Sequence, residues 1–139
     1  MYFFTIHNNY IFAGNTIKTM KTNQLIYTII GAAMEVHNTL GSGFLESVYQ
    51  EALAIELKSK NVTFIKEKKL EINYKGITLN KIFYADFICE GIIIELKCTG
   101  SITSEHIAQT LNYIKATNLR EAIILNFGTK SLEFKCLII

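Results

Sequence analysis

Hydrophobic residues change their spacing once along this chain, near residue 60, and that change most constrains the fold. Before it, apolar side chains recur every three or four residues, which is typical of a helix that buries one stripe. They include Ile26, Ile29, Ile30, Ala33, Val36 and Leu40. After it, β-branched and aromatic residues alternate with polar ones, as they do in strands. Helices packed on a sheet are therefore expected.

The same spacing predicts the individual elements. The first helix would start at an N-cap, Thr22, and end at the glycines of 41–43. The second would run to about residue 60 and bury Leu45, Val48, Ala52 and Ile55. Strands are predicted at 62–66, 68–74, 82–89, 92–97, 121–127 and 132–138.

A third helix is predicted over about 104–117, capped by Thr103 or Ser104. It would bury Ile107, Leu111 and Ile114. Turns are expected at Lys75-Gly76 and Glu90-Gly91. This order of elements predicts an α/β (α+β) fold with a mixed central sheet flanked by helices.

Length and composition indicate one domain. The chain has 139 residues, half of them hydrophobic, which is enough for a core without metal or disulfide support. Residues 1–19 show no cap or period and are interpreted as an N-terminal extension or a start codon placed too early, with the domain at 20–139. They make a poor signal peptide, and no apolar run is long enough for a membrane span.

The cysteines and the net charge bear on the cellular compartment and on the binding partners. Three widely spaced cysteines, Cys89, Cys98 and Cys136, argue against a disulfide framework or a zinc site and favour reduced thiols in the cytoplasm. The net charge of +2 is too small to demand a nucleic-acid partner and does not exclude one.

Charged residues inside an apolar strand are the sharpest anomaly in the chain. Residues 92–97 read IIIELK, and alternation along a strand puts Glu95 and Lys97 on one face. Asp86 poses the same problem within IFYADFIC. Such charges are costly to bury unless they are paired or bound to metal. If the two strands form a short hairpin, Asp86 and Glu95 lie near each other.

Two carboxylates held together repel, and a divalent cation relieves that repulsion. Hard oxygen ligands suit Mg²⁺ or Mn²⁺, and such an ion polarises a phosphoryl oxygen and generates hydroxide from water. A nearby lysine stabilises charge that develops on the phosphate. Asp86, Glu95 and Lys97 therefore predict either a phosphodiesterase site or a buried ion pair without catalysis.

Three more features lie on the predicted helices. Glu46 and Tyr49 share a face of the second helix, and Gln109 and Tyr113 share a face of the third. His37 stands beside the buried stripe of the first. Each also has an ordinary interpretation: a solvated carboxylate, an amphipathic boundary and a hydrogen-bonded histidine at the edge of the core.

Together these segments resemble a known family. The run GFLESVY at 43–49 matches the GxxExxY signature of a small bacterial and archaeal family named for that motif. IIGAAMEVHNTLGSG at 29–43 is similar to its lead-in, and YADFICEGIIIELKCTGSITSEHIAQTLNYI at 84–114 to its second half. The resemblance extends over about residues 22–138. It implies the restriction-endonuclease-like core of the PD-(D/E)XK nuclease superfamily, to which the family is assigned.

The resemblance also implies roles for the residues of the metal centre. Asp86 and Glu95 would be its core catalytic ligands, Glu46 a third metal ligand, and Lys97 the catalytic lysine. The metal would be Mg²⁺ or Mn²⁺.

Other matched residues would support the centre or bind substrate. Gln109 and Tyr113 match the QxxxY helix motif of RecB-type nucleases, which supports the active centre and contacts the substrate strand. Tyr49 belongs to the GxxExxY signature, and His37 to the EVH of the lead-in.

The chain departs from this family in two places, and the departures bear on its function. Tyr84 and Cys136 stand where many members carry Arg, which removes two cations expected at a phosphate-handling face. A metal-dependent nuclease acting on DNA or RNA is expected. A homodimer is one possible assembly. The alternatives are a weak or inactive nuclease-fold protein that binds nucleic acid or a protein, and a structural protein whose charges form ion pairs.

Overall fold

Three helices and five strands form the part of the chain that the computed structural model describes, residues 17–139, with side chains described from residue 23. In chain order they are α1 (Ile17–Leu40), α2 (Glu46–Ser59), β1 (Phe64–Tyr74), β2 (Ile77–Cys89), β3 (Ile92–Lys97), α3 (Ser104–Thr117), β4 (Glu121–Asn126) and β5 (Glu133–Ile138). The predicted α/β (α+β) class is confirmed. Within the described residues, no helix is long and apolar enough to cross a bilayer.

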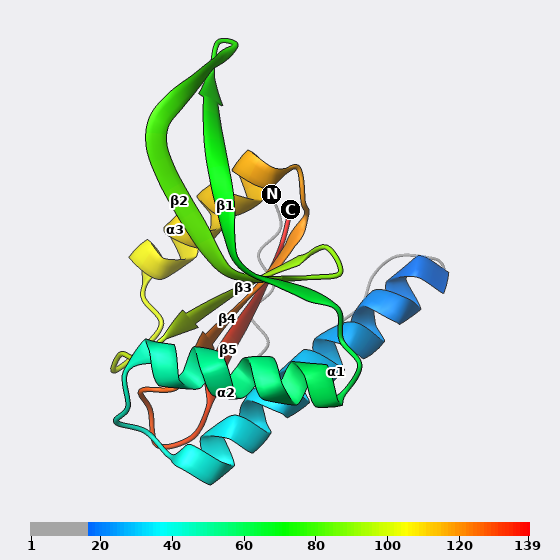
Figure 1. Ribbon diagram of the computed structural model, residues 1–139, viewed down its shortest axis with the longest axis vertical. Helices are drawn as coiled ribbons and strands as arrows, with labels where there is room; N and C mark the ends of the chain where they lie inside the picture. The colour runs from blue at the N-terminus through cyan, green and yellow to red at the C-terminus, as the bar shows by residue number, and fades with distance from the viewer. Residues whose placement is uncertain (1–16) are drawn as a thin grey trace.

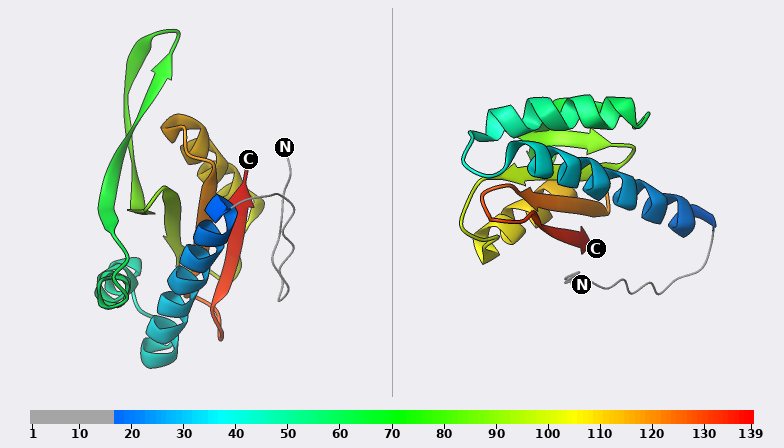
Figure 2. Two further views of the ribbon diagram at one scale, coloured as in Figure 1. Left: turned by 90° about the vertical axis from the view of Figure 1, so that its right-hand side faces the viewer. Right: turned by 90° about the horizontal axis from the view of Figure 1, so that it is seen from below.

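The strands form one mixed sheet in the order β1-β2-β3-β4-β5. Only β3 and β4 run parallel; the other three neighbouring pairs are antiparallel. Parallel neighbours need a crossover connection, and α3 supplies it. Helices α1 and α2 lie on one face of the sheet and α3 on the other (Figures 1 and 2).

Alternation along the strands builds a core on each face of the sheet. In β3, Ile92, Ile94 and Leu96 pack with α1 and α2, whereas Ile93 packs with α3. This is the alternation predicted for IIIELK, and it assigns the Glu95 position to the face covered by α3. The predicted stripe of α1 is buried from Ile26 to Val36.

Two tight turns set the register of the antiparallel strands. Glu90 and Gly91 have φ of 46° and 92°, and they join the paired residues Cys89 and Ile92. Two central residues with positive φ are what a two-residue hairpin turn requires, so the predicted turn is confirmed.

The second turn, at Lys75-Gly76, has the same geometry and closes a long β1–β2 hairpin, which projects from the body as an arm (Figure 1). This hairpin was predicted in pieces. The stretches 62–66 and 68–74 form one strand, and β2 begins at Ile77 rather than residue 82. Most of the arm is exposed, so its pairing leaves little hydrophobic signal in the sequence.

The buried face of α2 differs from the prediction. Leu45 and Ile55 are 76% and 68% exposed, and Val48 and Ala52 are not buried either. The helix instead buries Tyr49, Gln50, Leu53 and Leu57. Both stripes have helical spacing, and the stripe of Tyr49, Leu53 and Leu57 is the one that packs in the core against the sheet.

The helix starts differ from prediction at α1 and agree at α3. Helix α1 begins at Ile17, so Thr22 lies inside it rather than at its N-cap. Residues 1–16 lie outside the described residues, and the interpretation of 1–19 as an extension stays a prediction. At α3, Thr103 is the N-cap, and its hydroxyl accepts a hydrogen bond from the His106 N–H.

The buried face of α3 was predicted in part. The helix buries Thr110, Tyr113 and Ile114. Ile114 belongs to the predicted stripe, whereas Ile107 and Leu111 are only half-buried.

A buried amide fixes the loop that follows β3. Asn126 is fully buried, and its Oδ1 accepts the Thr99 N–H at 3.0 Å while its Nδ2 donates to the Thr99 carbonyl at 3.0 Å. The same Nδ2 donates to Glu133 Oε2 at 3.1 Å. Because Thr99 follows Lys97 by two residues, this network holds the end of β3 against β4 and β5.

Gly128 tests that packing. A Cβ at Gly128 would lie 2.5 Å from the Thr99 carbonyl oxygen and 2.7 Å from the Cys98 carbonyl carbon, both of which are backbone atoms. Gly128→Ala should therefore lower the free energy of unfolding by about 1–3 kcal/mol, measured by urea denaturation. Gly100→Ala is the matched control, since nothing lies within 4 Å of its Cβ position. Equal stability of the two variants would contradict the prediction.

Candidate active site

The β2–β3 hairpin brings two carboxyl groups together. The pairing Phe87↔Ile94 continues by one step to Asp86 and Glu95, where side chains replace the regular ladder. The Asp86 N–H donates to Glu95 Oε1 at 3.4 Å, and the Leu96 N–H donates to Asp86 Oδ2 at 2.8 Å. The two side chains therefore lie side by side at the point where the strands separate.

Burial makes this pair reluctant to carry two negative charges. Glu95 is 5% exposed, and burial followed by the charge of Asp86 raises the pKa of Glu95 to about 8. Burial also raises the pKa of Asp86, against the opposing effects of the Leu96 N–H and the Lys97 ammonium. At neutral pH the pair therefore retains a proton, and a cation could take the place of that proton.

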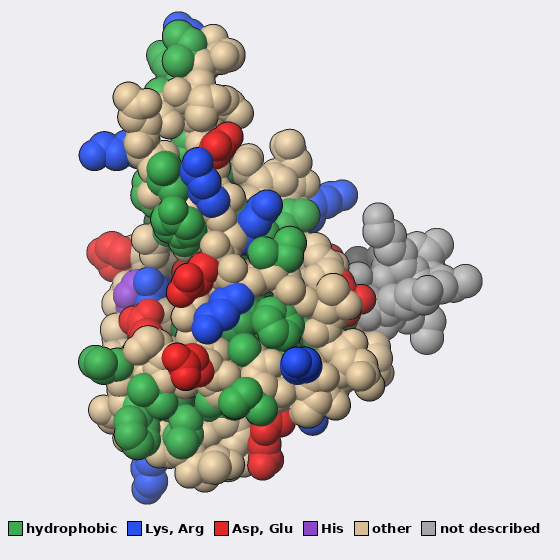
Figure 3. Space-filling model, in the orientation of Figure 1, with side chains coloured by type: hydrophobic (Ala, Val, Ile, Leu, Met, Phe, Trp, Pro, Cys, Tyr) green, Lys and Arg blue, Asp and Glu red, His purple; other side chains and the backbone are tan. Residues whose placement is uncertain are grey.

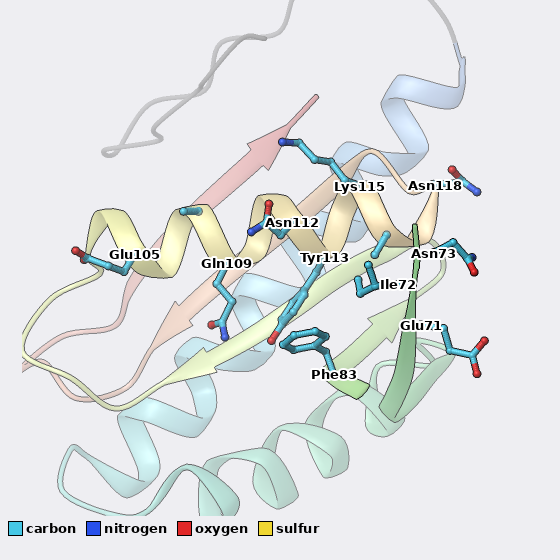
Figure 4. A pocket seen from close by; sticks show the side chains of 12 residues that line it. Glu71, Ile72, Asn73, Phe83, Glu105, Gln109, Asn112, Tyr113, Lys115 and Asn118 are labelled. Carbon is cyan, nitrogen blue, oxygen red and sulfur yellow. The ribbon is translucent and has the colours of Figure 1, made fainter. Parts of the chain in front are cut away.

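Lys97 and α3 close one side of the pair. The Lys97 ammonium donates to Gln109 Oε1 at 3.2 Å, which joins the end of β3 to α3. Tyr113, one turn further along, is buried, and its pKa is raised first by burial and then by the charges of Glu95 and Asp86. Gln109 and Tyr113 extend from the same side of α3 (Figure 4).

Glu46 approaches the group from the first residue of α2. Partial burial raises the pKa of its carboxyl; the Lys97 charge opposes this rise and the Asp86 charge adds to it. The carboxyl of Glu46 therefore lies within electrostatic range of both. Within the part of the chain that is described, however, no three Asp, Glu, His or Cys side chains are grouped closely enough to hold a metal ion. The three-carboxylate metal site stays a prediction.

The donor chemistry of this group still fits a hard divalent cation. Asp86 and Glu95 offer carboxylate oxygens in a largely buried setting, which is the ligand type that Mg²⁺ and Mn²⁺ prefer. Magnesium keeps several waters and often uses only one or two protein carboxylates. The pair fits such an ion without demanding a closed cage.

His37 and Tyr49 hold loops together at the α1–α2 side of the sheet. His37 Nε2 lies 2.8 Å from the Thr129 carbonyl, and its ring stacks on Phe127. Tyr49 also stacks on Phe127, with ring centroids 4.6 Å apart, and its hydroxyl donates to the Gly41 carbonyl at 2.6 Å. Tyr49 therefore fixes the turn that leads into Glu46, and His37 fixes the end of α1 against the loop at Thr129.

Sequence reasoning did not identify Glu67 and His106. Glu67 has φ of 51°, lies where the β1–β2 pairing skips Asp86, and its charge raises the pKa of Asp86. Nothing local in the sequence indicates this contact.

His106 did carry a signal, because it lies three residues before Gln109 on α3 and so shares its face. Its Nδ1 accepts the Thr103 N–H at 3.1 Å, so the neutral ring carries its proton on Nε2. A positive charge on this ring would lower the pKa of the Glu46 carboxyl.

Tyr84 and Cys136, where an arginine was expected from the family resemblance, lie in different environments. Cys136 is 3% exposed and packs with α1 and α2, on the face of the sheet opposite Glu95. An arginine at this position would lie in the core. Its absence therefore removes no cation from the face of the sheet that carries Glu95. Tyr84 is exposed on the arm. The three cysteines are free.

The raised pKa of Glu95 predicts how stability depends on pH. Between about pH 4.5 and 8 the folded state keeps a proton that the unfolded state releases, so the free energy of unfolding should fall as pH rises through this window. Glu95→Gln should remove that fall, because an amide keeps the hydrogen bonds without the charge. Each tenfold change in proton affinity corresponds to about 1.4 kcal/mol, so several kcal/mol are expected at pH 9.

Urea denaturation in EDTA from pH 5 to 9 measures this effect. Glu51→Gln, an exposed glutamate of α2, is the control and should follow the wild type. Parallel stability profiles for Glu95→Gln and the wild type would contradict the assignment of the proton to this pair.

Comparison with known proteins supports this fold. A structure described as "Crystal structure of SSO0001" is 17% identical to this chain, with a TM-score of 0.54; the match covers 95% of this chain and 71% of that one, and it shows a shared fold. No curated protein matches the chain. The sequence model described as "PD-(D/E)XK nuclease superfamily" matches residues 23–136, most of the chain. The chain belongs to the PD-(D/E)XK nuclease superfamily.

Proposed function

We propose that this protein hydrolyses phosphodiester bonds of nucleic acid in a reaction that depends on Mg²⁺ or Mn²⁺. The observation that carries the proposal is the contact between buried Glu95 and half-buried Asp86 at the point where β2 and β3 separate, with Lys97 at the end of β3. A structural ion pair would instead match each buried carboxylate with its own cation. Superfamily membership supports the same reaction class.

Each residue of the group has a role in this proposal. Asp86 and Glu95 would hold the ion, with Glu46 adding a ligand or a water contact. A divalent ion there supplies a Lewis acid and lowers the pKa of a bound water. Lys97 stabilises the negative charge that develops on the phosphate, and Gln109 orients the Lys97 ammonium.

Within the superfamily, we propose that the chain is a GxxExxY protein. The features that support this placement are the three signature residues Gly43, Glu46 and Tyr49. Gly43 has φ of 112°, a conformation that side-chain-bearing residues rarely adopt. Tyr49 anchors the same turn through the Gly41 carbonyl. The signature then serves to aim Glu46, at the start of α2, toward Asp86.

A binding protein without cutting activity is the second candidate. It is favoured by the absence, among the described residues, of a closely grouped three-ligand site. On the face drawn in Figure 3, basic side chains are spread along the arm and over the body below it. Since phosphate contacts supply most non-specific affinity, weak activity in isolation is expected. A homodimer, which would join two such surfaces, stays a prediction.

Metal binding and cutting should respond differently to two substitutions. Lys97→Ala should abolish cleavage of DNA and RNA substrates in Mn²⁺ while leaving the Mn²⁺-induced rise in melting temperature. Glu95→Ala should abolish both, because it removes a ligand. Gel assays on single- and double-stranded substrates measure the first property, and thermal melting with and without Mn²⁺ measures the second.

Lys58→Ala and Glu51→Ala, two exposed changes on α2, are the matched controls and should behave as wild type. Wild-type protein that binds Mn²⁺ and cuts no substrate would establish the binding-only alternative. Cleavage by Lys97→Ala at the wild-type rate would place the activity elsewhere.

A further inference from the structure

A cavity lies between the β1–β2 arm and α3, next to the site formed by Asp86, Glu95 and Lys97. Its volume is about 840 Å³, within the range of roughly 300–1,000 Å³ that small-molecule sites occupy. The arm contributes Ile72 and Phe83, and α3 contributes Ala108, Gln109, Tyr113 and Ala116. Asn73, Asn112 and Asn118 line it as well, so the wall combines apolar and aromatic side chains with several amides.

Two aromatic rings form the centre of this wall. The ring centroids of Phe83 and Tyr113 are 5.8 Å apart and the ring planes are tilted by 50°. Tyr113 is 7% exposed, whereas Phe83 is 38% exposed. Tyr113 thus packs against Phe83, and Phe83 is the more exposed of the two rings that line the cavity (Figure 4). An exposed ring held in place by a buried one is suited to stacking a flat aromatic ligand.

The charges around the cavity do not suit an anion. Its charged lining residues are Glu71, Glu105 and Lys115, which sum to one negative charge. Glu71 and Lys115 extend away from the two rings (Figure 4). The cavity therefore fits a neutral aromatic group better than a phosphate.

Gln109 connects the cavity to the site formed by Asp86, Glu95 and Lys97. It lines the cavity and accepts the hydrogen bond from Lys97 at 3.2 Å. Tyr113 lines the cavity as well, while its hydroxyl lies in the field of Glu95 and Asp86. A ligand with a neutral aromatic ring in the cavity would thus place an attached anionic group beside Lys97. A nucleotide has this combination of parts.

We propose that this cavity is a nucleobase site that holds an unpaired base of the substrate strand, stacked on Phe83. The inference rests on the proposed function and narrows its substrate to single-stranded nucleic acid, because a base inside the cavity cannot remain in a Watson–Crick stack. The stacked base would position the adjoining phosphodiester at Lys97.

The chain contains no tryptophan, so Phe83→Trp introduces a single fluorescent reporter at the site. In a Lys97→Ala background with Mn²⁺, which should bind without cutting, a single-stranded 12-mer should quench this fluorescence saturably. A blunt duplex of the same sequence should bind at least tenfold more weakly, and an abasic strand should bind weakly without quenching. DNA and RNA versions of the strand decide which sugar is accepted.

Substitutions at Phe83 test the site without a reporter. Phe83→Ala should weaken binding of the single strand about tenfold, in line with the loss of one base–aromatic stack. Phe83→Tyr should restore binding, which separates stacking from a loss of fold. Tyr74→Ala is the control: it removes an aromatic side chain that is 60% exposed at the tip of the same arm and lies outside the cavity lining.

The outcomes separate this site from the proposed reaction. Normal cleavage of single strands by Phe83→Ala, with unchanged binding, would overturn the base site and leave the nuclease function standing. Phe83-dependent binding without any cleavage by the wild type would support the base site and overturn the catalytic proposal. Equal quenching by duplex and single strand, or by the abasic strand, would overturn the base site.

Discussion

The two-residue turn at Glu90 and Gly91 sets the register between β2 and β3, and through that register it places Asp86 across from Glu95. Side chains alternate along a strand, so a slip of one residue would turn Glu95 toward α1 and α2, into an apolar core. The site therefore depends on the backbone conformation of the turn, midway in the chain between Asp86 and Glu95, as much as on the carboxylates themselves. Glu67, with its positive φ, interrupts the β1–β2 pairing opposite Asp86.

Burial of this pair determines its chemistry. A carboxylate removed from water loses solvation, and a second one beside it adds repulsion. Backbone N–H groups at Asp86 and Leu96 recover part of that loss, and a shared proton recovers more. Binding a divalent cation in exchange for the proton would relieve the same repulsion, which makes metal affinity dependent on pH. The apolar residues around the pair thus contribute to the site by withholding water.

The sequence predicts those parts of the fold in which local pattern and burial agree. The bounds 92–97 and 104–117 are those of β3 and α3, because each has one apolar arrangement and clear end signals. Helix α2 carries two apolar stripes, and only contact with the sheet, Phe127 included, selects the one containing Tyr49. The arm is exposed, so its pairing rests on backbone hydrogen bonds that leave no hydrophobic period.

The residues of the candidate site likewise differ in whether the sequence reveals them. Asp86, Glu95 and Lys97 are visible in the sequence because charge in an apolar strand is unusual. Glu67 and Asn126 are not visible, since their contacts join segments that are far apart in the chain. Asn126 in particular resembles any strand-end amide until the loop at Thr99 is folded against it.

Helix α3 joins the two halves of the proposed site. Its N-terminus is fixed by the reciprocal hydrogen bonds of Thr103 and His106, and the loop before it by Asn126 and Glu133. Gln109 and Tyr113 therefore sit on a rigid element, one turn apart, between the cavity and Lys97. Binding energy gained by a group in the cavity can then be used to hold an attached phosphate in place, rather than being lost to motion of the helix. This arrangement explains how a chain with a net charge of only +2 could still position a polyanion. The orientation would come from the neutral part of the ligand, and the charge of Lys97 would be needed only at the bond to be broken.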